Sequence, residues 1–520
     1  MSITETTKNY NPTHHRFFTQ SKILYGAVLL FLFGIGLGLR LVDITDAPLD
    51  FHPWRQLRAA SITRGIYYAA LPDADPETRQ AAISLGSQFE TLEPKVFETI
   101  VAYTYKLVGG EHLWIARLYA ILFWIIGGLA LFLIARRATS EDGAIVSLAF
   151  YMFAPFGFSG SRAFLPEPLM IMFILLAVYA FQRWADENTW KWALLSGIRA
   201  GIAIYIKVFA VYPLAVAAVL VVLVNWGFKR AIKDPKVWAA AGIMFLIPAP
   251  YYLFGLSGSY SPGEYLSSWT LGHIQLLLQP GFYVRWMTVL HDLVNLTVLL
   301  PSLMGVCLLP KKSRALSLGM WIGYLLLGMS VPSLILSHTY YSLIIVPIIA
   351  FSLAPLGDLL LSRIAALSRS WQVFFLGVAI LSVADPVVRD RNSLVARDYR
   401  LEVRGWEQLA EELPPGKLIG ITHDYNTRLN YYGWRAVAPW PNASDIEMDV
   451  LTGEVPLLDN PDWLPIFEQK TNGYDYFIVT VFNELEAQPV LRSILYDNYE
   501  IYAEDGRYIL FDLNAPKDGS

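Results

Sequence analysis

Residues 50–56 combine a carboxylate, an imidazole and a guanidinium within seven positions. A carboxylate such as Asp50 could act as a general base toward an acceptor hydroxyl or amine. The planar fork of Arg55 suits a phosphate group, and His52, Gln56 and Arg58 are further candidate binding residues beside it. The structural alternative is that Asp50 only caps a helix N-terminus while Arg55 is solvated.

A second group lies in residues 161–168, where Arg162 stands five positions before Glu167 between two apolar runs. Arg162 could bind a phosphate while Glu167 orients an acceptor or takes a proton. The alternative is a buried ion pair between them that only locks the hairpin. A third candidate, Lys207, lies in an apolar stretch and could bind an anionic lipid headgroup as a point charge. Otherwise its ammonium simply snorkels to the membrane interface.

A fourth group contains His338, Tyr340 and Tyr341 at the start of an apolar run. Tyrosines in such places are ordinary interfacial anchors, but the histidine beside them is less usual, so all three are candidate substrate-binding residues. The sequence shows no Gly-rich phosphate loop and no spacing typical of metal ligands. We therefore expect no metal site and no cofactor.

The elements that must position these groups are membrane helices. Of the 520 residues, 55% are hydrophobic and 16% charged, and the mean hydropathy is +0.40, whereas a soluble chain carries about a quarter charged residues. About 20 apolar residues cross a bilayer as a helix. The sequence therefore predicts a polytopic α-helical membrane protein with about eleven spans. The expected spans are 23–42, 112–134, 142–160, 166–183, 192–206, 208–226, 237–255, 286–309, 315–336, 339–361 and 371–385.

The orientation follows from the basic loops. Lys and Arg concentrate in alternate loops, such as Arg136 with Arg137 and Lys311 with Lys312. Because basic residues mark short cytoplasmic loops, we expect a cytoplasmic N-terminus in the plasma (inner) membrane. The first apolar segment then serves as a retained anchor. All four groups above then lie at the outer face. An ionisable residue at membrane depth costs about 2.5–3.5 kcal/mol on insertion scales, so such residues usually face a cavity or a partner.

Residues 386–520 differ from the membrane domain, residues 1–385. They hold twelve Lys and Arg against 23 Asp and Glu, and an odd number of spans places them outside. A helical pattern over 403–413 and short β-rich runs at 417–422 and 474–481, followed by a hairpin with an Asp-Gly turn, predict a small extracytoplasmic α/β domain. No basic face suits nucleic acid, and the single cysteine excludes an intramolecular disulfide.

Two outer loops are long enough to carry structure of their own. The first, 43–111, contains amphipathic stretches at 54–68 and 96–108, which we interpret as interfacial helices at the membrane surface. The second, 256–285, is rich in Gly, Ser, Tyr and Gln and could cover a site.

The order of these motifs resembles the bacterial branch of the GT-C glycosyltransferases, related to protein O-mannosyltransferases and the lipid A aminoarabinose transferase. The resemblance covers about residues 23–385. Besides the four groups it rests on residues 60–64, 93–95 (Glu-Pro-Lys), 114–118 and Pro347. It implies a GT-C-like fold, a polyprenyl-phosphate-linked sugar donor, and transfer at the outer membrane face. It leaves the acceptor open among a glycolipid, a glycan and a protein.

The resemblance also implies an essential acidic residue in the first outer loop, which by position is Asp50. Arg58 stands where relatives commonly have Asp, and Phe51 follows Asp50 where the aminoarabinose-transferase pattern has Glu. The general base is therefore open among Asp50, Asp43 and Glu167.

The expected chemistry is an inverting, metal-independent transfer in which Arg55, Arg162 and Lys207 stabilise the departing lipid phosphate. The main alternative is a lipid or glycolipid transporter or flippase, although the ionisable groups gather at one face and no inverted repeat is visible. A third possibility is a non-catalytic assembly subunit whose acidic tail recruits partners.

Overall fold

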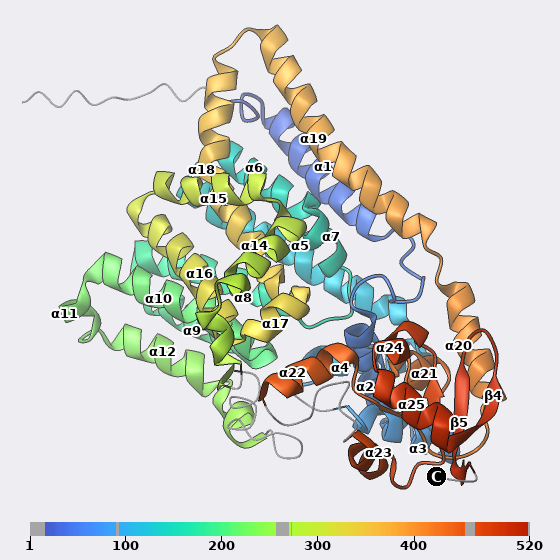
Figure 1. The fold of residues 1–520 in the computed structure, drawn as a ribbon. Helices are drawn as coiled ribbons and strands as arrows, with labels where there is room; N and C mark the ends of the chain where they lie inside the picture. The colour runs from blue at the N-terminus through green and yellow to red at the C-terminus, as the bar shows by residue number, and fades with distance from the viewer. Residues whose placement is uncertain (1–15, 90–92, 256–269, 272, 453–462, 518–520) are drawn as a thin grey trace, which may run out of the picture.

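The computed structural model describes residues 16–89, 93–255, 270–271, 273–452 and 463–517 (Figure 1). Helices make up the N-terminal part of the chain and a small sheet lies in the tail. The helices up to the middle of the chain are α1 Lys22–Arg40, α2 Pro53–Ala69, α3 Pro76–Ser87, α4 Val96–Val108, α5 Leu113–Ala138, α6 Glu141–Phe153, α7 Pro155–Gly160, α8 Glu167–Glu187, α9 Trp190–Ile206, η1 Val208–Ala210, α10 Val211–Trp226, α11 Phe228–Ala231 and α12 Pro235–Leu246. They are followed by η2 Tyr251–Gly255, η4 Ile274–Leu278, α14 Pro280–Val294, α15 Leu296–Leu308, α16 Lys311–Ser330, α17 Pro332–Ser337, η5 Thr339–Ile344, α18 Ile345–Ala365 and α19 Arg369–Ala396.

The chain is an integral membrane protein with several apolar helices. Among the described residues, six helices are long and apolar enough to cross a membrane. The pair α14 and α15, bent by 96°, adds a seventh if it forms one broken span. Each of the eleven expected ranges falls on an apolar helix or a helical pair, but α6, α9 and α12 have only 13, 17 and 12 residues. Helix α6 is short for a local reason, because it ends just before Pro155, where α7 begins.

The helices of the membrane domain pack closely around α5, α8 and α18, whose buried apolar side chains form one large core. Small residues permit the closest approaches, as is common between membrane helices. A Cβ atom on Gly319 of α16 would lie 2.3 Å from the Cα of Ala217 on α10. By contrast, α19 has no buried residue and lies at the edge of the bundle (Figure 1).

The first outer loop forms the two expected helices, α2 and α4, and also α3. Helix α4 keeps an exposed apolar face with Tyr103 and Leu107, which is typical of a helix at a membrane surface. Helix α2 is instead covered by protein, because α3, α4 and α21 (Thr427–Tyr432) pack against it. Of the second outer loop, residues 256–269 and 272 lie outside the described residues, so its expected covering role is not described.

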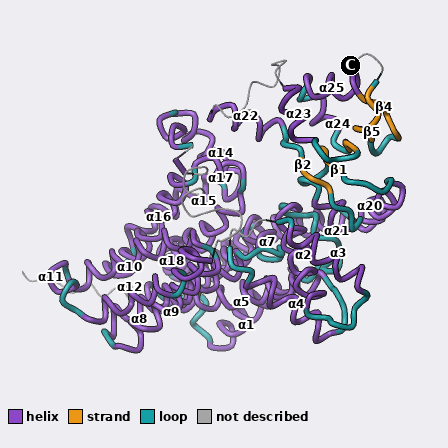
Figure 2. The backbone as a smooth tube through the Cα atoms, turned by 90° about the horizontal axis from the view of Figure 1, so that it is seen from below, coloured by secondary structure: helices purple, strands orange, loops and turns teal. Residues whose placement is uncertain are grey.

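The tail is the expected small α/β domain, and Figure 2 shows the strands gathered there. Its sheet has the order β2-β1-β3-β5-β4. Strands β1 and β2 are parallel, as are β1 and β3, whereas β5 is antiparallel to both β3 and β4. The strands are β1 Leu418–Ile421, β2 Val437–Pro439, β3 Tyr476–Val479, β4 Tyr499–Glu504 and β5 Ile509–Pro516; the helices besides α21 are α20 Arg400–Glu412, α22 Ala443–Thr452, α23 Trp463–Thr471, α24 Phe482–Glu486 and α25 Pro489–Asn498. Because α21 packs on α2, the tail and the first outer loop lie on the same side of the membrane domain.

Candidate active site

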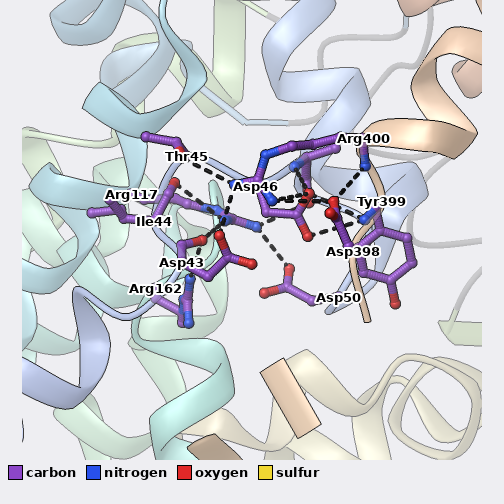
Figure 3. A network of polar contacts seen from close by, with 11 residues as sticks. Asp43, Ile44, Thr45, Asp46, Asp50, Arg117, Arg162, Asp398, Tyr399 and Arg400 are labelled. Carbon is purple, nitrogen blue, oxygen red and sulfur yellow. Dashed lines mark hydrogen bonds and ion pairs between the residues drawn. The ribbon is translucent and has the colours of Figure 1, made fainter. Parts of the chain in front are cut away.

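Asp50 faces a cleft that lies between the first outer loop, α7 and the C-terminal end of α19. Three carboxylates of the first outer loop, Arg117 of α5 and Arg162 of the turn before α8 line it, together with the segment that leads into the tail (Figure 3). We call this the outer cleft. Its lining residues are Asp43, Asp46, Asp50, Arg117, Phe158, Ser159, Arg162, Asp390, Ser393, Leu394, Arg397 and Tyr399.

Asp50 is held at the wall of the outer cleft by Arg117 of α5. Nη2 of Arg117 donates to Oδ1 of Asp50 at 3.0 Å, and the Asp50 side chain remains 18% exposed. The N-cap of α2 is His52, not Asp50, and it makes no side-chain cap hydrogen bond. The capping interpretation of Asp50 is therefore wrong, and its carboxylate is available to the cleft.

Gln56 fixes the shape of the loop around Asp50. Its Nε2 donates to the Phe51 carbonyl at 2.7 Å and lies 3.4 Å from Oδ1 of Asp50. Its Oε1 accepts the backbone N–H of Phe164 at 2.8 Å. Because each polar atom of this buried amide has a partner within the protein, Gln56 positions the loop around Asp50.

Arg162 enters the outer cleft from the turn before α8. Only 2% of this residue is exposed, and its Nη2 donates to the Asp43 carbonyl at 3.2 Å. Its Nε and Nη1 have no hydrogen-bond partner in the described part of the chain. Arg162 makes no ion pair with Glu167, which contacts Lys207 instead. The interpretation that Arg162 and Glu167 lock the hairpin together is therefore wrong.

A second set of charged residues is buried beside the outer cleft, and we call it the Arg55–Lys207 cluster. It consists of Arg55, Glu93, Glu167, Lys207 and Tyr340. Lys207 contacts Glu167 directly and lies 3.7 Å from Oε1 of Glu93, which itself pairs with Arg55. Arg55 is buried, not solvated, and Lys207 is only 2% exposed and does not snorkel. Both structural alternatives for these two cations are therefore wrong.

Glu93 stays ionised because the surrounding cations outweigh its burial. Desolvation alone would raise the pKa of this carboxyl, but the charges of Arg55, Lys207 and Arg58 lower it to about 2. Arg58 is buried on the next turn of α2 after Arg55. The cluster therefore holds ionised groups of both signs in a region from which water is largely excluded, where electrostatic interactions are strong.

Two histidines and the rings of Tyr340 and Tyr341 pack against the Arg55–Lys207 cluster. Lys207 lies 5.0 Å from the ring centre of Tyr340 and 4.6 Å from that of Tyr341. Nε2 of His52 is 2.8 Å from Oγ1 of Thr339, and the His52 ring meets Tyr340 edge-on. His338 packs on the same ring. Burial lowers the pKa of both histidines to about 4, so both are neutral at physiological pH.

Comparisons with known proteins agree with this architecture. A family model described as dolichyl-phosphate-mannose-protein mannosyltransferase matches residues 93–254. The structure of ArnT from Cupriavidus metallidurans bound to undecaprenyl phosphate is 15% identical, with a TM-score of 0.55 over 94% of this chain and 97% of that one. The archaeal oligosaccharyltransferase AglB from Archaeoglobus fulgidus is 12% identical, with a TM-score of 0.59 over 93% and 74%. No curated protein matches the sequence.

This chain has the GT-C fold. The resemblance drawn from its motifs is thereby confirmed, and a GT-C fold with a matching mannosyltransferase model supports glycosyltransferase activity. Within this fold the candidate residues divide into two groups. Asp50 and Arg162 line the outer cleft. The residues that belong to the buried cluster or touch it are Arg55, Arg58, Glu167, Lys207, His338, Tyr340 and Tyr341.

Two residues of the candidate site, Glu93 and Arg117, were not predicted from the sequence as site residues. Glu93 was predicted only as part of a motif, although a carboxylate directly before a proline and an amphipathic helix was a usable signal. Arg117 lies in the motif 114–118 but was not predicted as a site residue. An arginine near the start of an apolar helix usually faces a cavity or a polar partner, which was a usable signal. Among the described residues, no three His, Cys, Asp or Glu side chains gather in an arrangement that could hold a metal ion.

Proposed function

We propose that this protein is a glycosyltransferase that moves a sugar from a polyprenyl-phosphate-linked donor to an acceptor at the outer face of the membrane. The fold supports the enzyme class. The donor class is supported by the bound molecules of two structures with the same fold, undecaprenyl phosphate in ArnT and dolichol-phosphate in AglB. The observation that carries the proposal is the position of Asp50, a carboxylate facing the outer cleft within a few residues of the buried cations Arg55 and Arg58.

The orientation of the protein is part of the proposal. The tail packs on the first outer loop, and Arg400 donates to Oδ1 of Asp43 at 2.7 Å. In the expected cytoplasmic loops, Asp186 pairs with Arg137 at 2.8 Å and with Lys312 at 3.5 Å. The basic loops therefore meet one another, as loops on one side of a membrane should, which supports a cytoplasmic N-terminus and an extracytoplasmic tail.

The proposed reaction is a single displacement. An acceptor hydroxyl or amine attacks the anomeric carbon of the sugar, its proton passes to Asp50, and the bond between that carbon and the phosphate oxygen breaks. The lipid phosphate leaves with the bonding electron pair. Attack opposite the phosphate inverts the anomeric centre. Arg55, Arg58 and Lys207 are the cations proposed to stabilise the charge on the departing phosphate, in a region of low dielectric.

Arg162 has a different place in this scheme from the one expected. The three cations Arg55, Arg162 and Lys207 were expected to act on one phosphate. In the structure Arg55 and Lys207 share Glu93, while Arg162 lies among Asp43, Asp50 and Arg117. The donor phosphate is therefore assigned to the Arg55–Lys207 cluster, and Asp50 lies on the side of the outer cleft.

Mass spectrometry of membrane glycolipids and surface glycans tests the function. A strain lacking the protein should lose one hexose or pentose addition, and the wild-type gene should restore it. A strain that carries Asp50→Asn in place of the wild type should keep the protein in the membrane but not restore the addition. Identical glycolipids and glycans with and without the protein would reject transfer. Movement of a lipid-linked sugar across the bilayer without release of lipid phosphate would identify a flippase instead.

A further inference from the structure

The turn between α10 and α12 carries positive charge that the protein does not neutralise. We call residues 227–236 the basic turn. Its basic residues are Lys229, Arg230, Lys233 and Lys236. The one acidic residue, Asp234, lies 3.9 Å from Nζ of Lys236. The other three cations are exposed, and none of them forms an ion pair with a described residue. These three positive charges are therefore available to an anionic partner.

The basic turn has a defined shape. Gly227 ends α10 at a φ of 71°, a backbone conformation that favours glycine. Nε1 of Trp238 donates to the Ile232 carbonyl at 2.9 Å. Nζ of Lys236 donates to the Asn188 carbonyl at 3.0 Å, which joins the turn to the segment before α9. Because the surface is already formed, a partner that binds there does not have to order the turn first.

Tryptophans mark the level of the membrane surface beside the basic turn. Trp190 is the first residue of α9, Trp226 is the last residue of α10, and Trp238 lies in the first turn of α12. Tryptophan is enriched at the boundary between lipid and water. Figure 1 shows α11, the middle of the turn, at the edge of the bundle and away from the tail. Since the basic turn directly follows Trp226, its cations lie at the level of the lipid headgroups.

Apolar side chains alternate with the cations of the basic turn. Phe228 is 68% exposed and Ile232 is 45% exposed, and each directly precedes a lysine. Large apolar side chains together with lysine and arginine are typical of segments that lie in the membrane interface. An acidic soluble protein would match the charges but would not supply an acyl layer for these apolar side chains. The charge complementarity and the apolar side chains therefore both favour a lipid surface.

We propose that the basic turn binds anionic phospholipids in the leaflet at this end of the bundle. Lys229, Arg230 and Lys233 contact the phosphate headgroups, while Phe228 and Ile232 enter the boundary of the acyl chains. Groups of four or more Lys and Arg beside a membrane helix are typical of anionic-lipid binding. In the orientation proposed above, this is the cytoplasmic leaflet.

This lipid site is separate from the candidate active site. Lys236 contacts the segment before α9, whereas Lys207 follows the other end of that helix. A helix of 17 residues is about 25 Å long. Lipid binding at the basic turn therefore does not depend on sugar transfer, and it can be measured without donor or acceptor.

Native mass spectrometry of the purified full-length protein tests the lipid site. The protein is incubated in detergent with equal amounts of phosphatidylglycerol, which is anionic, and phosphatidylcholine, which is zwitterionic. We expect the wild type to retain phosphatidylglycerol in preference, and rising salt concentration to weaken that preference. The combined variant Lys229→Gln, Arg230→Gln and Lys233→Gln should lower the ratio of bound phosphatidylglycerol to phosphatidylcholine at least about tenfold. The reason is that each basic residue near an anionic surface contributes about fivefold.

The matched control removes three charges elsewhere. The combined variant Lys311→Gln, Arg363→Gln and Arg369→Gln changes exposed basic residues in other loops expected on the cytoplasmic side and should keep the wild-type ratio. Circular dichroism confirms that both variants fold. An equal fall in the control, or an unchanged ratio in the variant of the basic turn, would overturn the lipid site.

Two further measurements distinguish a lipid from a soluble anion. Phe228→Ser keeps every charge and should still weaken retention of phosphatidylglycerol, because one apolar anchor is lost. Glycerol 1-phosphate, which has the phosphate but no acyl chain, should compete only at far higher concentration than the lipid. Unchanged retention in Phe228→Ser, or competition by glycerol 1-phosphate at the same concentration as the lipid, would show that the basic turn binds soluble anions and would overturn the proposed lipid site.

Discussion

The ammonium group of Lys207 contacts the carboxylate of Glu167, and both residues are almost fully buried. Lys207 ends α9 in an extended conformation, and Glu167 is the first residue of α8. Removal of Lys207 leaves Glu167 as an unpaired buried carboxylate and should cost about 3–5 kcal/mol. We therefore expect Lys207→Met to lower the melting temperature of the purified protein strongly, and Glu167→Gln to lower it less, because Lys207 then still has Glu93 at 3.7 Å.

The double variant separates stability from function. Lys207→Met combined with Glu167→Gln leaves no unpaired charge, so it should melt at a higher temperature than Lys207→Met alone. It should still fail to transfer sugar, since the proposed phosphate-binding ammonium is gone. Thermal unfolding in detergent and the transfer assay measure the two effects. Full transfer by the double variant would show that Lys207 has only a structural role.

Asp50 and Asp43 can be distinguished as the general base. Asp50→Asn removes the proton acceptor and should lower the transfer rate about 10²–10⁴-fold, the usual contribution of a general base. Asp43 is engaged by Arg400 through Oδ1, so Asp43→Asn should weaken the contact with the tail and keep most of the transfer rate. Transfer rates of purified variants, with circular dichroism to confirm folding, check this. The reverse order of rates would move the base to Asp43.

Much of the fold could be predicted because long runs of apolar residues identify membrane helices. The break between helices at Lys207 and the hairpin of β4 and β5 follow from single charged or turn residues. Strand β2 escaped prediction because three residues are too few to show a periodicity. The burial of α2 also escaped, since α21, which covers it, follows more than 350 positions later in the chain.

The charged residues of the site could be predicted from the sequence, but not which of them contact one another. Arg162 and Glu167 are five positions apart, and yet α8 begins at Glu167 and turns that side chain toward Lys207. Arg162 remains in the preceding turn and reaches Asp43, 119 positions away. Sequence distance therefore gave the wrong partner, because the packing of α8 against α9 and of α5 against the first outer loop decides which charges meet.

The two buried histidines should make the folded protein sensitive to acid. His52 and His338 have a pKa of about 4 in the fold, lowered from 6.5 first by burial and then by nearby charges, Arg55 among them. As the pH falls below 6.5, the unfolded chain takes up protons there while the folded protein does not, so stability is lost between pH 6.5 and 4. Above pH 6.5 neither residue makes the free energy of unfolding depend on pH.

Thermal unfolding of His338→Gln over the same pH range provides the measurement. The variant should lose less stability than the wild type between pH 6.5 and 4, since one of the two sites of proton uptake is missing. Replacement of the exposed His291 by Gln is the control and should leave the slope unchanged. Parallel curves for His338→Gln and the wild type would show that the pKa of His338 is not lowered in the fold.

Chelation tests whether the proposed reaction needs a metal ion. The departing group is a lipid monophosphate, and Arg55, Arg58 and Lys207 offer three positive charges to it, against Glu93 and Glu167. We therefore expect EDTA to leave the transfer rate of the purified protein within about twofold of the untreated rate. Rising salt concentration should lower the transfer rate only modestly, because buried charges are screened little. Loss of transfer with EDTA and its return with added divalent cation would show that a metal supplies part of the charge assigned to these residues.

Arg64 should anchor the tail to the first outer loop. Its Nε donates to both oxygens of the Glu111 carboxylate, at 3.1 Å and 3.0 Å, and its Nη2 donates to Oε1 at 2.9 Å. Its Nη1 donates to the Tyr431 carbonyl at 2.6 Å. It also lies 3.8 Å from the ring centre of Tyr431. Lysine cannot reproduce this planar arrangement, so Arg64→Lys should speed proteolytic release of residues 400–517 several-fold, about 2–5 times. Arg507→Lys, which changes an exposed ion pair within the tail, is the matched control and should not. Equal cleavage rates in Arg64→Lys and the wild type would mean that the tail is held mainly by Arg400 and the contacts of α21.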